Sequence, residues 1–211
     1  MSESANTSER ASQFHEQARL EELLKWYIDD EDHLSLKNAL DIAKVVHEDQ
    51  SYGDEKYLIH VLRVAAVAVD KKLPKEVVFA CLLHDTVEDS QKSDRPLTVA
   101  HVTSLFGNAV ALGVEHATIL PSEKQAGIHK SEKAKQSKIG HLVKLCDALV
   151  NLDKSRMELM TFTYTSTDNS SKIDAIHRHF EENQETVAVL RFDEPTIKMV
   201  QNEILLLNQA A

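Results

Sequence analysis

The stretch VVFACLLHDTVED, residues 77–89, decides the fold class. Its first seven residues are all apolar, and its last six carry one histidine and three acids. Pro74 stands at a helix-start position just before it, and the run is longer than an ordinary strand. We therefore predict one helix over residues 74–89. Because it is apolar on nearly all sides, we expect other helices to cover it.

The rest of the chain favours an all-α fold. Only 5 Gly and 4 Pro occur among 211 residues, so few positions favour tight turns. Apolar residues recur at helical spacing in most other segments. Further helices are predicted at residues 14–28, 35–46, 57–69, 96–107, 141–151, 172–190 and 195–208, with Ser35 as an N-cap. Residues 161–171, TFTYTSTDNSS, are typical of an irregular loop.

The length of the chain suits one domain with short appendages. We expect a disordered tail at residues 1–12 and an N-terminal helix with an acidic linker at 13–33. A helical core follows at 34–160, and a loop with helices that pack on this core occupies 161–211.

Composition excludes several classes of protein. Hydrophobic residues make up 42% and charged residues 27%, which is typical of a soluble globule. No apolar stretch approaches the ~20 residues that a bilayer requires, and the first ten residues do not resemble a secretory signal. Cys81 and Cys146 each lie in an apolar run, which favours buried thiols in a reducing, cytoplasmic setting. A net charge of −10 argues against nucleic-acid and membrane partners.

One segment departs from the acidic balance. Residues 123–156 carry a charge of +4, while the rest of the chain carries −14. The segment is either a solvated lysine-rich loop or a landing patch for an anionic substrate, and the sequence leaves both interpretations open.

Three apolar segments each carry a histidine or an acid. His60 lies in the first turn of the apolar helix predicted at 57–69. Asp147 lies within LVKLCDALV at 142–150, and His84 and Asp85 directly follow the apolar run of 77–83. Alone, His60 fits a hydrogen-bonded core histidine and Asp147 fits a lysine pair. Together, two imidazoles and two carboxylates satisfy a divalent cation, and a buried carboxylate needs such a partner.

Glu88 and Asp89 follow His84 and Asp85 at a spacing of four residues. On a helix this spacing puts them about one turn, ~5.4 Å, further along. They suit carboxylates that act through water. The alternative is a solvated helix C-terminus, although acids at that end oppose the helix dipole.

These residues resemble the HD-domain hydrolases of the RelA/SpoT type, above all the single-domain small alarmone hydrolases and metazoan SpoT homologues. The resemblance covers about residues 36–156. It includes HEDQ at 47–50, YLIH at 57–60, LLHDTVED at 82–89, Phe106-Gly107 and HLVKLCDALVNL at 141–152.

The resemblance implies an all-helical HD-domain bundle that binds a small-molecule nucleotide. It implies Mn²⁺ held by His60, His84, Asp85 and Asp147. It also implies hydrolysis of the 3′-pyrophosphate of (p)ppGpp to GDP or GTP plus pyrophosphate, with Glu88 and Asp89 activating or orienting water.

For the substrate, the resemblance places Asn151 beside the nucleotide and Lys144 before the ligand aspartate, where Lys144 either contacts substrate or pairs with an acid. The Arg-Lys pair usual after HEDQ is missing here, so Tyr52 either stacks on a purine or packs the loop, and Lys56 is a candidate phosphate contact. Lys154 and Arg156 are further candidates. Three other family positions also differ, at Ile119, Ala148 and Val150.

Because these substrate-contacting positions differ from those of the family, other functions remain open. The same site could act on (p)ppApp or on NADPH. The chain could instead be a non-catalytic nucleotide-binding module, or an antitoxin to an alarmone synthetase. The helix at 14–28 has no match in minimal members, and it either caps the domain or forms an interface between two copies.

Overall fold

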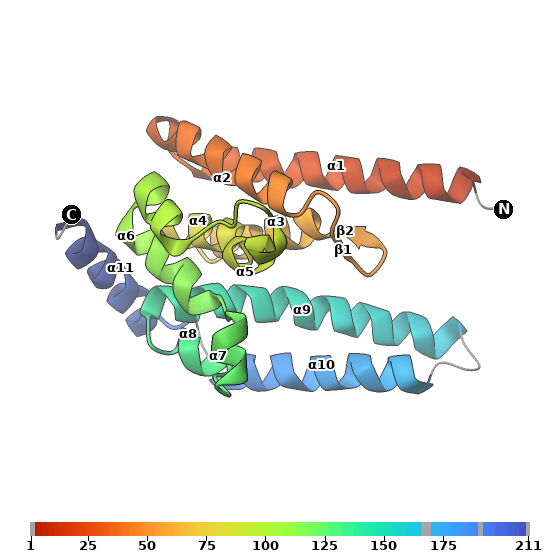
Figure 1. Ribbon diagram of the computed structural model, residues 1–211. Helices are drawn as coiled ribbons and strands as arrows, with labels where there is room; N and C mark the ends of the chain where they lie inside the picture. Colours follow the sequence, from red (N-terminus) through yellow and green to blue (C-terminus); the bar gives the residue numbers. More distant parts are fainter. Residues whose placement is uncertain (1–2, 166–169, 190–191, 210–211) are drawn as a thin grey trace.

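The computed structural model describes residues 3–165, 170–189 and 192–209, and it confirms the all-α prediction (Figure 1). The main helices are α1 (Glu3–Tyr27), α2 (His33–Val46), α3 (Tyr57–Asp70), α4 (Lys75–Leu83), α5 (Thr86–Asp89), α6 (Val99–Ala117), α7 (Pro121–Gln125), α8 (Lys130–Ala134), α9 (Lys138–Thr165), α10 (Ser170–Val189) and α11 (Glu194–Gln209). Two 3₁₀ turns, η1 (Asp30–Asp32) and η2 (Ser90–Lys92), and a hairpin of β1 (Ser51–Tyr52) and β2 (Glu55–Lys56) accompany them.

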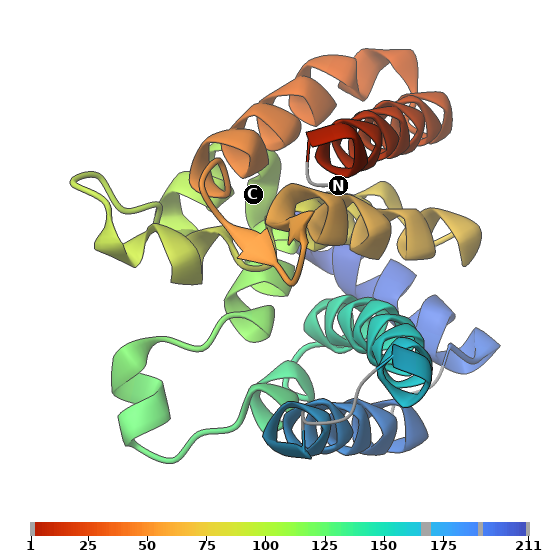
Figure 2. The same ribbon diagram turned by 90° about the vertical axis from the view of Figure 1, so that its right-hand side faces the viewer.

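Helices α3, α4 and α9 lie at the centre of the molecule. Helices α1 and α2 lie on one side of them, and α10 lies along α9 on the other (Figures 1 and 2). All seven residues from Val77 to Leu83 in α4 are buried, as the apolar run predicts. Within the described ranges, no helix has the length and apolar character needed to span a membrane.

Helix α1 corrects the prediction for the N-terminus. It begins at Glu3, so residues 3–12 are helical where we expected a disordered tail, and residues 1–2 lie outside the described ranges. Leu20 and Leu24 are 3% and 0% exposed in the main core, and Gln13 Nε2 donates to the Asp54 carbonyl oxygen at 3.0 Å. These contacts favour the capping interpretation of this helix.

A short hairpin, which the sequence did not predict, follows α2. Ser51 pairs with Lys56, and the turn contains Gly53 at φ +68°. Arg63 of α3 fixes the hairpin to α1, because its guanidinium bonds Glu55 at 2.7 and 2.9 Å and Glu16 at 2.9 and 3.0 Å. Planar, paired contacts of this kind hold three elements in one geometry.

Three predicted boundaries are wrong. The helix expected over 74–89 is broken at residues 84–85, between α4 and α5. Helix α2 begins at His33, so Ser35 is not its N-cap. The loop expected at 161–171 is shorter, because α9 runs to Thr165 and α10 begins at Ser170, while residues 166–169 lie outside the described ranges.

The central helices approach closely at Gly113 of α6. A Cβ added there would lie 2.7 Å from Ile139 Cγ2 and 2.8 Å from the Cβ of Ala80. Real Cβ contacts are essentially never that short. Gly113 therefore allows α4, α6 and α9 to meet, and α4 and α9 carry much of the candidate site.

We predict that Gly113→Ala destabilises the protein by about 1–3 kcal/mol, because the overpacking outweighs the better helix propensity of alanine. Urea unfolding followed by circular dichroism measures the difference. Glu115→Ala, at an exposed position of the same helix, is the control and should change stability by less than about 0.5 kcal/mol. Equal stability of the two variants would contradict the close packing.

Candidate functional site

The break between α4 and α5 presents His84 and Asp85 to the interior. Side chains satisfy the backbone carbonyls that the break would otherwise leave without partners. Thr86 Oγ1 donates to the Leu83 carbonyl at 2.7 Å, and Thr118 Oγ1 donates to the His84 carbonyl at 3.2 Å. Asp85 is the N-cap of α5 but makes no side-chain cap bond, so its carboxylate is available to the site.

Four side chains from three parts of the chain meet at this break. His60 of α3 places Nε2 3.3 Å from Asp147 Oδ1 of α9. His84 Nε2 lies 2.9 Å from Asp85 Oδ2 and 3.9 Å from Asp147 Oδ1. All four residues are at most 7% exposed. The structure thus brings together the residues that the resemblance implies as metal ligands.

The protonation of His84 tests whether a cation fits. His84 Nδ1 lies 2.8 Å from the Cys81 carbonyl oxygen, which can only accept, so Nδ1 carries the proton. Burial lowers the pKa of His84, but the charge of Asp85 raises it to a net value above the usual one, so without a metal ion a proton on Nε2 can lie between the two residues. In the neutral ring, Nε2 turns a lone pair towards Asp85 Oδ2, and this buried atom has no hydrogen-bond partner. Two facing acceptors at 2.9 Å repel unless a positive charge lies between them. The donor set of two imidazoles and two carboxylates therefore fits a divalent cation.

The electrostatics favour charged carboxylates in this cluster. Burial raises the pKa of Asp85. The charges of His84 and Lys130 lower this pKa by a larger amount, so the net pKa lies well below the usual range. Burial likewise raises the pKa of Asp147, and Lys144 and the two histidines lower it well below that range. Both acids are therefore ionised at neutral pH.

A second layer of hydrogen bonds orients the two aspartates. Tyr57 donates to Asp85 Oδ2 at 2.5 Å, and Lys144 Nζ donates to Asp147 Oδ2 at 2.6 Å. Asn151 Nδ2 donates to Asp147 Oδ1 at 2.8 Å. Lys144 therefore pairs with an acid, which was one of its two interpretations. Outer partners of this kind fix ligand geometry at metal centres.

Glu88 and Asp89 lie on α5 directly after the break. Glu88 Oε2 accepts from the Ile119 backbone N–H at 3.2 Å and from Lys130 Nζ at 2.8 Å. Asp89 Oδ2 lies 3.5 Å from His47 Nδ1. Burial raises the pKa of Asp89, and the charges of Asp85 and Glu88 raise it further. The two acids thus differ, because Glu88 has a cation beside it and Asp89 has an elevated proton affinity.

Lys130 is the residue that most clearly escaped the sequence analysis. Its Nζ lies 3.1 Å from Asp85 Oδ1 as well as 2.8 Å from Glu88. Burial lowers its pKa, but those two carboxylates raise it to a net value above the usual one. Its only signal in the sequence was membership of the lysine-rich segment, where Lys133 pairs with Glu123 at 2.6 Å and Lys135 with Glu132 at 2.7 Å.

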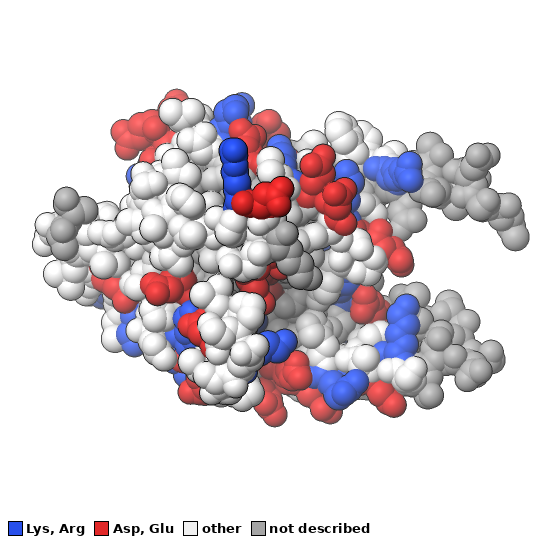
Figure 3. Space-filling view, viewed as in Figure 1, with Lys and Arg blue, Asp and Glu red and all other residues white. Residues whose placement is uncertain are grey.

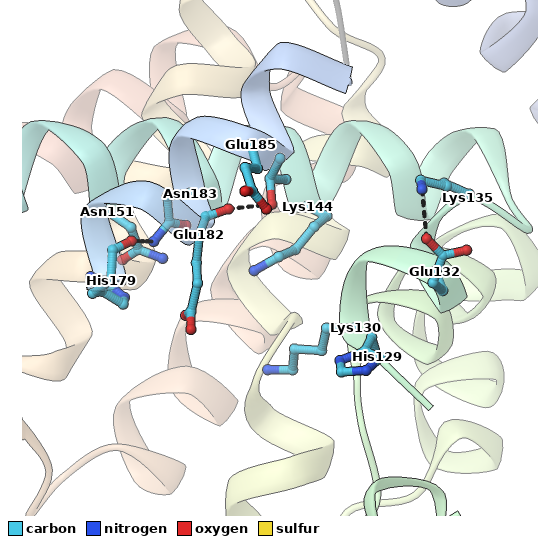
Figure 4. Close-up of a pocket in the computed structure, with 11 residues that line it drawn as sticks. His129, Lys130, Glu132, Lys135, Lys144, Asn151, His179, Glu182, Asn183 and Glu185 are labelled. Atoms are coloured by element: carbon cyan, nitrogen blue, oxygen red, sulfur yellow. Dashed lines mark hydrogen bonds and ion pairs between the residues drawn. The ribbon is translucent and has the colours of Figure 1, made fainter. Parts of the chain in front are cut away.

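A cavity of about 600 Å³ opens beside this cluster (Figure 4). Lys130, Lys144 and Asn151 line it together with Lys135. The opposite wall comes from α10, which the resemblance does not cover, and it carries His179, Glu182, Asn183, Glu185 and Thr186. This volume is within the range of nucleotide-sized pockets.

The remaining predicted substrate residues do not line this cavity. Tyr52 donates to Asn151 Oδ1 at 2.9 Å, and Lys154 holds the hairpin by bonding the Tyr52 carbonyl, with its Nζ 3.6 Å from the centroid of the Tyr52 ring. Tyr52 thus contacts the loop and also lies at the edge of the site, because its ring centroid is 5.1 Å from that of His60 and its hydroxyl bonds Asn151. Lys56 lines a separate hollow beside His47, and Arg156 is exposed outside the cavity lining.

Comparisons with known proteins agree with this geometry. A model of the HD domain family matches residues 39–191, more than half of the chain. MESH1 of Danio rerio, a guanosine-3′,5′-bis(diphosphate) 3′-pyrophosphohydrolase, is 34% identical over 128 residues, which are 56% of this chain and 67% of that protein.

Two further relatives extend the comparison. The bifunctional (p)ppGpp synthase/hydrolase SpoT of Escherichia coli is 33% identical over 106 residues, which are 50% of this chain but only 14% of that protein. This chain therefore spans a small part of the bacterial relative. A solved structure of a metazoan SpoT orthologue that hydrolyses ppGpp shares the fold, with a TM-score of 0.52 at 21% identity over 84% of this chain and 97% of the other. The family match and the identity to MESH1 show that this chain belongs to the HD domain family.

Proposed function

We propose that this chain hydrolyses the 3′-pyrophosphate of (p)ppGpp-type nucleotides, releasing GDP or GTP and pyrophosphate, and that it uses one divalent cation, Mn²⁺, in a cytoplasmic setting. One observation carries the proposal. His60, His84, Asp85 and Asp147 converge at the helix break, with Glu88 and a lysine-lined cavity beside them. The activities of MESH1 and SpoT support the choice of substrate.

The proposed ligands are His60, His84, Asp85 and Asp147. A divalent cation held by them would supply Lewis-acid polarisation of a phosphoryl oxygen and would favour deprotonation of water.

Protein side chains accept the proton of the attacking water and orient that water. Glu88, held by the Ile119 N–H and Lys130, accepts the proton of the attacking water as a general base. Asp89, with its raised pKa, supports the orientation of that water. The water oxygen bonds to phosphorus as the bond between phosphorus and the ribose 3′-oxygen breaks. The 3′-oxygen takes up the proton that Glu88 accepted, and pyrophosphate leaves.

The lysines act on the phosphate charge. Lys130 and Lys144 line the cavity next to the ligand carboxylates, where positive charge offsets the developing negative charge on the phosphoryl oxygens. Such an effect is strong because the carboxylates and lysines there are largely removed from water.

A substrate panel tests the reaction itself. Protein loaded with Mn²⁺ is incubated with ppGpp, ppApp and NADPH, and phosphate and pyrophosphate are measured separately. Pyrophosphate release from ppGpp, with GDP as the other product, is the expected result. Phosphate release from NADPH alone, or tight nucleotide binding without turnover of any of the three, would overturn the proposal.

Asp85→Ala should abolish both metal content and turnover, because it removes one ligand and leaves Lys130 without one of its two acids. Metal content is measured by mass spectrometry of the purified protein, and pyrophosphate release by a coupled assay. Asp94→Ala, at an exposed position after η2, is the control and should keep both. A fully active Asp85→Ala protein would refute the ligand assignment.

Glu88→Gln should keep the metal and lower kcat about 10²- to 10⁴-fold, because the amide cannot accept the proton of water. Lys130→Met should lower kcat by a smaller factor, since Glu88 then loses its cation but retains the Ile119 N–H. Glu48→Gln, on the exposed turn after α2, serves as the matched control. Wild-type kcat in Glu88→Gln would remove Glu88 from the mechanism.

A further inference from the structure

The charged side chains on the two walls of the cavity differ in their partners, because in the part of the chain that the structure describes the lysines are paired with acids and the glutamates of α10 are not. Lys130 and Lys144 lie on the side of the carboxylate cluster, whereas Glu182 and Glu185 project from α10 (Figure 4). Figure 4 shows the Glu182 side chain extending from its helix into the cavity. Among the described residues, neither of these two glutamates has a hydrogen bond or ion pair to its carboxylate. A charged group that faces a cavity without a partner is available to a ligand.

Contacts between α9 and α10 fix where Glu182 lies. Ser155 Oγ of α9 lies 3.0 Å from His179 Nδ1, and Asn183 Nδ2 donates to the His179 carbonyl at 2.7 Å. Ser155 is 2% exposed and Asn183 is 6% exposed, so this junction is closed to solvent. Glu182 directly precedes Asn183 in α10, so the same junction also holds the backbone of Glu182 in place.

The two walls orient any nucleotide that enters. Glu182 repels the phosphates, and Lys130 and Lys144 offer N–H donors to them on the other side, so the base is directed towards α10. Acidic and basic side chains are interspersed over the face of the molecule shown in Figure 3. The carboxylate of Glu182 is an acceptor only, so the base edge that meets it must present donors.

Guanine and adenine differ at that edge. Guanine presents its N1–H and N2–H₂ as two adjacent donors, which match the two oxygens of one carboxylate. Adenine presents one amino donor beside the N1 acceptor, and that acceptor would face a carboxylate lone pair. Charge-assisted pairs of hydrogen bonds are the stronger kind, and an unmatched acceptor is costly.

We propose that Glu182 determines base specificity by accepting both donors of guanine, so that the site prefers guanine over adenine nucleotides. This inference rests on the proposed function for the phosphate end of the site. It assigns a specificity role to α10, which lies outside the HD motifs.

The test compares Glu182→Gln with wild type on ppGpp and ppApp. A glutamine can donate as well as accept, so it tolerates adenine. We expect kcat/KM for ppGpp to fall about 10- to 100-fold and kcat/KM for ppApp to rise, because the amide donates to adenine N1 and accepts from the adenine amino group. The ratio of kcat/KM for ppGpp to kcat/KM for ppApp therefore decreases. Glu181→Gln, an exposed neighbour on α10 outside the cavity lining, should leave the ratio unchanged.

Binding of GDP and ADP by calorimetry separates this inference from the reaction. We expect wild type to bind GDP more tightly and Glu182→Gln to lose that preference, even in a protein without turnover. If ppGpp is hydrolysed but Glu182→Gln keeps the wild-type base ratio in both assays, the role of Glu182 is refuted and the proposed function stands. If no substrate is turned over but the preference for GDP depends on Glu182, the proposed function is refuted and the role of Glu182 stands.

Discussion

The site depends on an electrostatic conflict that the packed helices cannot relieve by themselves. His84 Nε2 and Asp85 Oδ2 face each other at 2.9 Å, with Asp147 Oδ1 at 3.9 Å, in a region closed to water. The Cys81 carbonyl holds the His84 proton on the other nitrogen. A positive charge is therefore required at one point, and Lys130, Lys144 and Tyr57 neutralise or orient the carboxylates around it.

A small number of contacts in the fold hold these side chains close together. The break between α4 and α5 turns Asp85 out of the helix, and Thr86 and Thr118 satisfy the carbonyls there. Gly113 allows the helices to approach closely enough for α4 and α9 to share the site. Arg63 ties α1 to the hairpin, so the N-terminal helix supports Tyr52 and, through it, Asn151.

The sequence predicted the all-α fold and the four residues that converge, because ionisable side chains inside apolar runs are conspicuous. It did not predict the break at residues 84–85, since the apolar pattern favours a continuous helix and does not reveal the hydrogen bonds that Thr86 and Thr118 make to the carbonyls there. Lys130 could not be separated from its lysine-rich neighbours, because its role depends on carboxylates 45 and 42 residues away in sequence. Glu182 gave no signal, because a glutamate on an amphipathic helix is ordinarily solvated.

Diffraction from a crystal soaked in MnCl₂, recorded at a wavelength where manganese scatters anomalously, tests the central claim most directly. One anomalous peak is expected within coordination distance of His60, His84, Asp85 and Asp147. An absent peak, or a peak elsewhere while His84 Nε2 bonds Asp85 through a proton of its own, would contradict it.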